Sequence, residues 1–130
     1  NVLALAQHLD DLAESFIMSA FNAGQLQTMK AHYVNDKGDI RIIRPLVRVR
    51  ESQTRDFSAS AGLPVIEDNC PACYAKPQAR AETKNLLLEQ EKKNPHLYAN
   101  LWTAMQPLIA DDNQAGQAEL HPAKTGKALL

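Results

Sequence analysis

Two groups of residues in this chain combine side-chain types and spacing that chemistry can use. Near the start, His8-Leu9-Asp10-Asp11 brings an imidazole and two carboxylates together where an amphipathic segment begins. In the middle, Cys70-Pro71-Ala72-Cys73 brings two thiols within reach of one metal ion or cluster. The sequence therefore offers one candidate site for a metal-bound nucleotide and one for a thiolate-bound metal.

The group from His8 to Asp11 has two interpretations. In the first, the carboxylates hold Mg²⁺, and His8 or the amides at the N-terminus of a helix meet phosphate oxygen. In the second, this is an ordinary first turn of a helix, with Asp10 or Asp11 as its cap. Acidic first turns are common, so the group by itself leaves both interpretations open.

The cysteine pair, Cys70 and Cys73, fits a Zn site, an iron–sulfur cluster, a redox pair or two reduced structural thiols. Thioredoxin-type chemistry is disfavoured because that motif follows the first strand of the sheet directly. A structural Zn site needs four ligands, and the remaining histidines have no partners at metal-ligand spacing. Any metal site would therefore need ligands from outside this chain.

The only concentration of basic residues runs from Arg41 to Arg50 and includes Arg44 and Arg48. Its alternation of arginine with β-branched residues predicts a strand with one charged face. That face could follow the phosphates of a nucleic acid. It could equally be a solvated face, neutralised in part by Glu51.

Composition limits the chain to one domain of 130 residues with 45% hydrophobic residues. Its 14 Lys and Arg against 15 Asp and Glu give no global field to attract nucleic acid or membrane. No apolar stretch approaches the roughly 18 residues needed to cross a bilayer. The chain begins without Met and without a signal-peptide pattern. We therefore expect a cytoplasmic protein with no membrane partner, and we interpret residue 1 as a truncation point inside a domain.

Hydrophobic spacing predicts alternating strands and helices. An apolar run at residues 2–6 indicates a buried parallel strand, and Ala23-Gly24 should stop the helix that follows it. The further predicted elements are a hairpin of residues 32–34 and 40–43, a helix at 51–61, a strand at 64–66, helices at 78–93 and 96–109, and a loose polar tail from Asp111.

With these residues in place, the chain resembles the second half of a PP-loop ATPase of the tRNA 2-thiolation type, and is most similar to the tRNA 2-thiocytidine synthetase family. The resemblance extends from about residue 2 to about residue 110 and rests on an ordered set of motifs. These are His8–Asp11, Ala23-Gly24, Ile43-Arg44-Pro45-Leu46 with Arg50-Glu51, Pro64-Val65-Ile66 before the cysteine pair, and Lys92-Lys93-Asn94-Pro95 followed by Ala104-Met105-Gln106.

The resemblance implies an α/β fold. Residues 1–110 would be the C-terminal portion of an adenine-nucleotide α-hydrolase-like (PP-loop) parallel sheet, with a β-hairpin insertion and C-terminal helices. Residues 111–130 would be a flexible tail. It also implies a reaction: the enzyme adenylates a tRNA base, here cytidine, with ATP and Mg²⁺, and sulfur then displaces AMP. A [4Fe-4S] cluster participates.

The same resemblance implies roles for individual residues and partners. The catalytic carboxylates would be Asp10 and Asp11; Gln7, His8 and Asp11 would contact ATP and Mg²⁺; Cys70 and Cys73 would bind the cluster; and Arg44, Arg48 and Arg50 would bind tRNA. The implied partners are tRNA, a sulfur donor protein and the N-terminal half of the same enzyme.

Three departures from the family pattern matter. Ala6-Gln7 stands where the family has Gly-His. The S-G-G-x-D-S phosphate loop and the first C-x-x-C do not occur in these 130 residues, so the cluster's ligand set is incomplete. We therefore expect this chain alone to be inactive. The alternatives are a non-catalytic paralogue and a small Zn- or thiol-binding interaction module, such as a Zn-bridged dimer. An unpaired edge at residues 2–6 would also favour a homodimer or aggregation.

Overall fold

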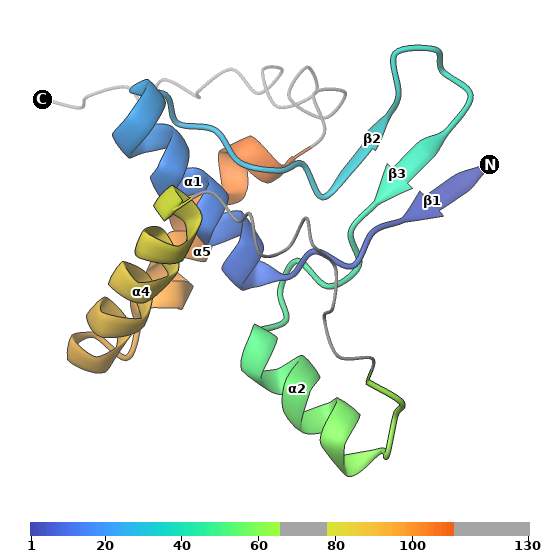
Figure 1. Cartoon of the computed structure of the whole chain (residues 1–130). Coiled ribbons are helices and arrows are strands. Elements are labelled where there is room, and N and C mark those ends of the chain that lie inside the picture. Colours follow the sequence, from blue (N-terminus) through green and yellow to red (C-terminus); the bar gives the residue numbers. More distant parts are fainter. Residues whose placement is uncertain (66–77, 111–130) are drawn as a thin grey trace, which may run out of the picture.

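A computed structural model describes residues 1–65 and 78–110 (Figure 1). In this part of the chain, helices α1, α4 and α5 pack together, and a small sheet extends from them to one side. Helix α2 projects on its own below the sheet in Figure 1. The cysteine pair, His121 and the predicted tail from Asp111 lie outside the described residues.

The sheet has three strands in the order β1-β3-β2. Strands β2 (His32–Val34) and β3 (Arg41–Ile43) pair antiparallel and confirm the predicted hairpin. The turn between them is closed by Asn35, whose Oδ1 accepts hydrogen bonds from the Asp39 and Ile40 amides. An asparagine side chain that bonds to nearby amides is a common way to close such a turn.

Strand β1 (Val2–Ala4) pairs parallel to β3, in the orientation that the sequence predicts. The strand is shorter than residues 2–6, and the prediction that it is buried is wrong: Val2 is 63% and Leu3 is 47% exposed. Because β1 forms one edge of the sheet, the described part of the chain leaves these apolar side chains in solvent.

Helix α1 (Leu9–Ala23) follows β1 and ends where the sequence predicts. Gly24 adopts the left-handed conformation with φ 63°, and its amide donates back to the Ser19 carbonyl. Glycine reaches this conformation without steric cost, so it is the usual residue at a helix end of this type. Leu12 and Ala13 on α1 are fully buried.

The other helices also follow the predicted pattern. Helix α2 (Glu51–Ser60) ends just before Gly62, and α4 (Gln78–Lys93) and α5 (Leu97–Ile109) are separated by Asn94-Pro95. The strand predicted at 64–66 is wrong for Pro64 and Val65, which are exposed and belong to no strand. No described strand lies beside them to complete a ladder.

The hydrophobic core lies where α1, α4 and α5 meet. Its buried members are Leu9, Leu12, Ala13, Val47, Leu87, Tyr98, Met105 and Ile109. Among the helices of residues 1–65 and 78–110, none has the length and apolar character needed to cross a membrane.

Replacing Leu12 with alanine tests this core. Leu12 is 0% exposed, so Leu12→Ala removes packed methyl groups and should lower the free energy of unfolding by about 3 kcal/mol. Urea unfolding followed by circular dichroism measures the change. Leu26→Ala is the control, since Leu26 is 67% exposed and should change stability little. Equal effects of the two substitutions would contradict the packing described here.

Candidate functional site

The junction between β1 and α1 is held by a reciprocal cap. His8 is the N-cap of α1 with extended backbone, and its Nδ1 accepts a hydrogen bond from the Asp11 amide at 3.4 Å. Asp11 returns the contact, because its Oδ2 accepts from the His8 amide at 3.0 Å. The N-cap is therefore His8, whose imidazole takes the place of the usual hydroxyl or carboxylate cap, and Asp11 is its N3 partner in a capping box. The interpretation of Asp10 or Asp11 as the cap itself is wrong.

The neighbouring carboxylates, Asp10 and Asp11, face different surroundings. Consecutive helical residues are turned by about 100°, so the two side chains cannot share a face. Asp10 is only 6% exposed and turns towards the segment before α2, whereas Asp11 lines a pocket. The two carboxylates therefore have different main partners, although both lie near His8 Nδ1, Asp10 at 3.7 Å and Asp11 at 3.3 Å.

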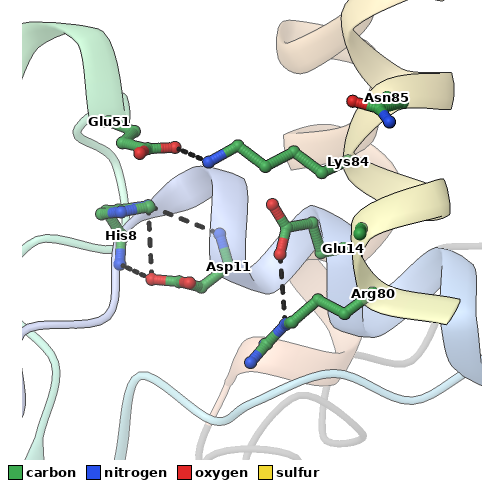
Figure 2. Close-up of a pocket in the computed structure, with 8 residues that line it drawn as sticks. His8, Asp11, Glu14, Glu51, Arg80, Lys84 and Asn85 are labelled. Carbon is green, nitrogen blue, oxygen red and sulfur yellow. Dashed lines mark hydrogen bonds and ion pairs between the residues drawn. The ribbon is translucent and has the colours of Figure 1, made fainter. Parts of the chain in front are cut away.

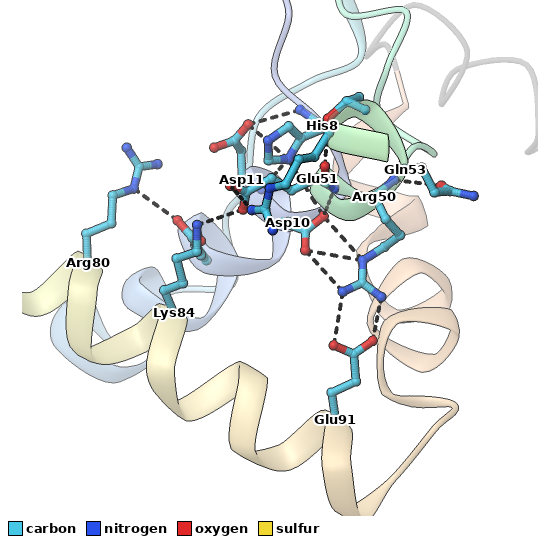
Figure 3. A network of polar contacts seen from close by, with 12 residues as sticks. His8, Asp10, Asp11, Arg50, Glu51, Gln53, Arg80, Lys84 and Glu91 are labelled. Atoms are coloured by element: carbon cyan, nitrogen blue, oxygen red, sulfur yellow. Dashed lines mark hydrogen bonds and ion pairs between the residues drawn. The ribbon is translucent and has the colours of Figure 1, made fainter. Parts of the chain in front are cut away.

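Arg50 is the main partner of Asp10. Its Nε donates to both carboxylate oxygens at 3.2 Å, and its Nη2 donates to Oδ1 at 3.1 Å. The amide of Glu51 adds a hydrogen bond of 2.7 Å to Oδ2. Arg50 also binds Glu91 on α4, at 2.6 and 3.1 Å (Figure 3). Its guanidinium carbon lies 3.3 Å from the centre of the Tyr98 ring on α5.

These contacts set the ionisation of the network. Burial opposes the charge on Asp10, but hydrogen bonds from Arg50 and the Glu51 amide, with the Arg50 charge, outweigh it and hold the pKa of Asp10 below its ordinary value. Burial also opposes the charge of Arg50, yet its two carboxylate partners raise the pKa of Arg50. Burial and the nearby Asp10 charge raise the pKa of Tyr98. The pair is therefore ionised at neutral pH.

A pocket of about 360 Å³ opens beside this network, between the N-terminus of α1, the start of α2 and one face of α4 (Figure 2). Acidic residues from α1 and α2 face basic residues from α4 across it. The lining residues are His8, Asp11, Glu14, Glu51, Arg80, Ala81, Lys84 and Asn85.

Two ion pairs cross the pocket. Lys84 Nζ binds Glu51 at 2.6 Å, and Arg80 Nε lies 3.2 Å from Glu14 Oε2. The hydrogen bond from Lys84 is the largest effect on Glu51, and it lowers the pKa of that carboxyl despite partial burial. Burial dominates at Glu14 and raises its pKa, although Arg80 and Lys84 act in the opposite direction. The two carboxylates therefore differ in how readily they give up a proton.

Six of these pocket residues have no role in the sequence-based site: Glu14, Glu51, Arg80, Ala81, Lys84 and Asn85. Glu14 could have been found, because it lies three residues after Asp11 on the same face of an acidic first turn. Arg80 and Lys84 share a helix face at the i, i+4 spacing, yet only the packing of α4 against α1 places them opposite carboxylates.

The predicted tRNA-binding arginines lie in three different settings. The strand ends at Ile43, so the prediction of one strand with a charged face along residues 41–50 is wrong. Pro45 lacks the amide that a ladder needs, and turns follow it. Arg44 binds Gln7, and Arg50 binds Asp10. Arg48 is exposed and lies 4.8 Å from the Trp102 ring.

The predicted metal ligands Cys70 and Cys73 fall in the segment 66–77, outside the described residues. That segment joins α2 to α4 in the sequence, and both helices contribute to the pocket. Within residues 1–65 and 78–110, no group of three or more His, Cys, Asp or Glu side chains is arranged to hold a metal ion. The roles predicted for Gln7, His8, Asp10, Asp11 and the cysteines remain predictions.

Asp10→Asn tests the buried ion pair. A carboxyl with a lowered folded pKa stabilises the fold above its unfolded value and loses that contribution as pH falls through its folded pKa. At pH 7 the substitution should therefore cost about 1–3 kcal/mol of unfolding free energy. Below the ordinary aspartate value of 3.8 the difference from native should shrink.

Urea unfolding at pH 7 and pH 3 measures this difference. Asp36→Asn is the matched control, because Asp36 lies exposed in the hairpin turn. A cost for Asp10→Asn that is the same at both pH values would contradict an ionised, stabilising pair.

Glu14→Gln should behave in the opposite way. The raised pKa of Glu14 means that the native chain loses stability as pH rises from the ordinary value of 4.5 through the folded pKa. A neutral amide escapes this penalty, so at pH 7 the variant should equal or exceed native stability, by up to about 1 kcal/mol.

Thermal melts at pH 4 and pH 7 measure the effect, with the exposed Glu89→Gln as control. Glu14→Gln and native should converge at the lower pH. A clear loss of stability at pH 7 would show that the Arg80 ion pair outweighs burial.

The sequence of this chain is similar to a known domain family and to curated enzymes. Residues 1–87 match the PP-loop domain family. Curated relatives include tRNA-cytidine(32) 2-sulfurtransferases from Pelobacter propionicus, 37% identical over 81% of this chain and 39% of the relative, and Geobacter sulfurreducens, 37% identical over 81% and 41%. The enzyme of that name from Geotalea daltonii is 38% identical over 81% of this chain and 42% of the relative.

The chain spans about two fifths of the length of these relatives. The mixed sheet with its parallel β1–β3 pair and flanking helices agrees with the expected adenine-nucleotide α-hydrolase-like α/β fold. Because the family pattern covers most of the described residues and includes β1, α1 and the pocket side of α4, the chain belongs to the PP-loop domain family.

Proposed function

We propose that this chain is part of an ATP-dependent tRNA sulfurtransferase that replaces an oxygen of cytidine with sulfur. The observation that carries the proposal is the 37% identity of 105 residues to enzymes named tRNA-cytidine(32) 2-sulfurtransferase. The pocket supports it, since it lies beyond the carboxyl end of β1 and at the N-terminus of α1. This is where α/β sheets bind ligands.

The proposed reaction has two steps. The cytidine carbonyl oxygen attacks the α-phosphorus of ATP, a P–O bond forms, and pyrophosphate leaves. Sulfur at the sulfide level, supplied as hydrosulfide by a donor protein, then attacks the ring carbon and loses its proton, and the C–O bond breaks to release AMP with the original oxygen, so no change of oxidation state is required. Both steps need negative charge to be neutralised and the reacting groups to be held in place.

Within this proposal, the residues at the start of α1 serve ATP. His8 and Asp11 line the pocket and are assigned to the nucleotide and its Mg²⁺. Mg²⁺ in nucleotide sites takes one or two carboxylates with phosphate and water, so a single pocket carboxylate such as Asp11 fits this chemistry. Gln7 and Asp10 are each held by an arginine, and we assign them to support this site.

The cysteine pair is assigned to a [4Fe-4S] cluster. Thiolates are the ligands that such clusters take, and two from this chain leave further ligands to be supplied from elsewhere. Cys70 and Cys73 lie in the sequence between α2 and α4, which both contribute to the pocket. The cluster, when bound, would supply an iron site for sulfur near the nucleotide.

For tRNA, the exposed Arg48 is the best placed of the three predicted arginines. Its guanidinium lies over Trp102 on α5, outside the hydrogen-bond network around Asp10. An arginine in this setting can exchange solvent for phosphate at low cost. Arg44 and Arg50 would first have to release their partners Gln7 and Asp10.

Anaerobic reconstitution of the complete protein that carries this chain tests the proposal. We expect iron, acid-labile sulfide and ATP-dependent thionucleoside in bulk tRNA, with iron and product both lost in Cys70→Ala. Ser52→Ala is the control, since Ser52 is an exposed residue of α2.

A folded complete protein with neither iron nor thionucleoside would overturn the proposal. The Ala6-Gln7 departure would then favour a non-catalytic paralogue, and bound Zn in place of iron would favour the interaction module. Pyrophosphate release that requires both ATP and tRNA separates the adenylation step from sulfur transfer.

A further inference from the structure

Arg44 holds one end of the β1–α1 junction. Its Nε donates to Gln7 Oε1 at 3.0 Å, and its Nη1 donates to the Lys30 carbonyl at 2.6 Å. The guanidinium also lies 5.7 Å from the centre of the Tyr33 ring. Arg44 thereby connects the residue before the α1 cap to the segment that leads into β2.

Arg50 holds the other end of the same junction. All three guanidinium nitrogens contact carboxylates, those of Asp10 on α1 and Glu91 on α4 (Figure 3). One face of the group is covered by Tyr98. The Arg50 side chain is only 21% exposed. A planar fork with bidentate contacts fixes direction as well as distance.

Main-chain groups of the residues on either side of Arg50 also bind the junction. The Leu9 amide donates to the Val49 carbonyl at 2.9 Å, and the Glu51 amide donates to Asp10 at 2.7 Å. The segment from Arg44 to Glu51 therefore lies along the junction that carries His8 and Asp11. By contrast, the neighbouring Arg41 and Arg48 are exposed.

We propose that Arg44 and Arg50 form an arginine clamp: two positioning residues that fix the β1–α1 junction through Gln7 and Asp10, and so aim His8 and Asp11 into the pocket. The clamp acts through these side chains and touches neither ATP nor tRNA. The identity of the ligand rests on the proposed function above, whereas the positioning itself rests on the contacts of the chain.

The clamp implies that the paired arginines, Arg44 and Arg50, position the junction, whereas the exposed arginines, Arg41 and Arg48, are free to contact a ligand. For Arg50 to bind a phosphate, the buried Asp10 carboxylate must lose its partner, and an unpaired buried carboxylate is costly. Arg44 uses Nε and Nη1 for Gln7 and the Lys30 carbonyl, so a phosphate could take its paired fork only by displacing one of these contacts. Arg41 and Arg48 carry no such cost. Contacts to RNA from this segment therefore come from the exposed pair.

Nuclear magnetic resonance of the 130-residue chain tests the positioning directly. Arg50→Lys and Arg44→Lys keep the positive charge but remove the planar guanidinium with its paired donors. Arg41→Lys and Arg48→Lys are the matched controls. We expect the clamp variants to shift the amide signals of His8 and Asp11, and the controls to leave them in place.

If circular dichroism shows that Arg50→Lys does not fold, Arg44→Lys decides the outcome, since the partner that it disturbs, Gln7, is uncharged and leaves no unpaired charge behind. Junction signals that stay unchanged in a folded Arg44→Lys or Arg50→Lys chain would overturn the clamp.

The complete protein separates the clamp from RNA binding. Arg50→Lys should lower thionucleoside formation at least about tenfold, with tRNA affinity and its salt dependence close to native. Arg48→Gln should weaken tRNA binding and reduce the salt slope by about one. The reverse pattern, with tRNA affinity lost in Arg50→Lys, would overturn the clamp in favour of a direct RNA contact.

Failure of the proposed function has a different signature. If the complete protein makes no thionucleoside while Arg50→Lys and Arg44→Lys still displace the junction signals, the clamp stands and the assigned reaction falls. If thionucleoside forms and the junction signals do not move, the reaction stands and the clamp falls.

Discussion

The arrangement of the pocket depends on one buried ion pair, between Asp10 and Arg50. Asp10 is 6% exposed, and a carboxylate in that environment has to be paired and hydrogen-bonded or lose its charge. Arg50 supplies the pairing, and its remaining donors reach Glu91 on α4 while its face lies on Tyr98 of α5. Three helices therefore meet at one guanidinium group. The hydrophobic core holds the same helices together, but it is non-directional, and the ion pair sets their relative orientation at the pocket.

The pair also explains how two adjacent carboxylates come to differ. The turn of about 100° per helical residue sends Asp10 towards Arg50 and leaves Asp11 on the pocket side. The Arg50 charge compensates that of Asp10, so the Asp10 carboxylate repels its neighbour Asp11 less. The N-terminal amides of α1 and the Asp11 carboxylate then act on the pocket without repulsion from a free neighbour. In the acidic dipeptide Asp10-Asp11, the first carboxylate thus stabilises the fold through Arg50, and the second lines the pocket.

The sequence predicts features whose signals are local and misses those that depend on distant partners. Helix α1, its end at Gly24 and the β2–β3 hairpin follow from spacing and turn residues a few positions apart. The contacts of Arg44 and Arg50 join residues 37 and 40 positions apart, and no periodicity encodes them. Pro45, by contrast, is a local signal: its missing amide predicts that the second hairpin strand ends there, and β3 does end at Ile43, so the charged face expected along residues 41–50 does not form. Exposure of β1 depends on which strands and helices lie beside it.

The mixed charge of the pocket suits the ligand that the proposed function requires. Lys84 and Arg80 are paired with Glu51 and Glu14, so a bare anion would have to break these pairs, and a bare cation would meet the two basic groups. A phosphate chain with a divalent ion carries both signs. Its metal can share carboxylate oxygen while its phosphates take the released ammonium and guanidinium groups, so no buried charge is left alone. When such a ligand binds, each ion pair inside the protein is replaced by an ion pair with the ligand. The net desolvation cost is therefore smaller than that of placing an ion in a pocket whose charges all have one sign.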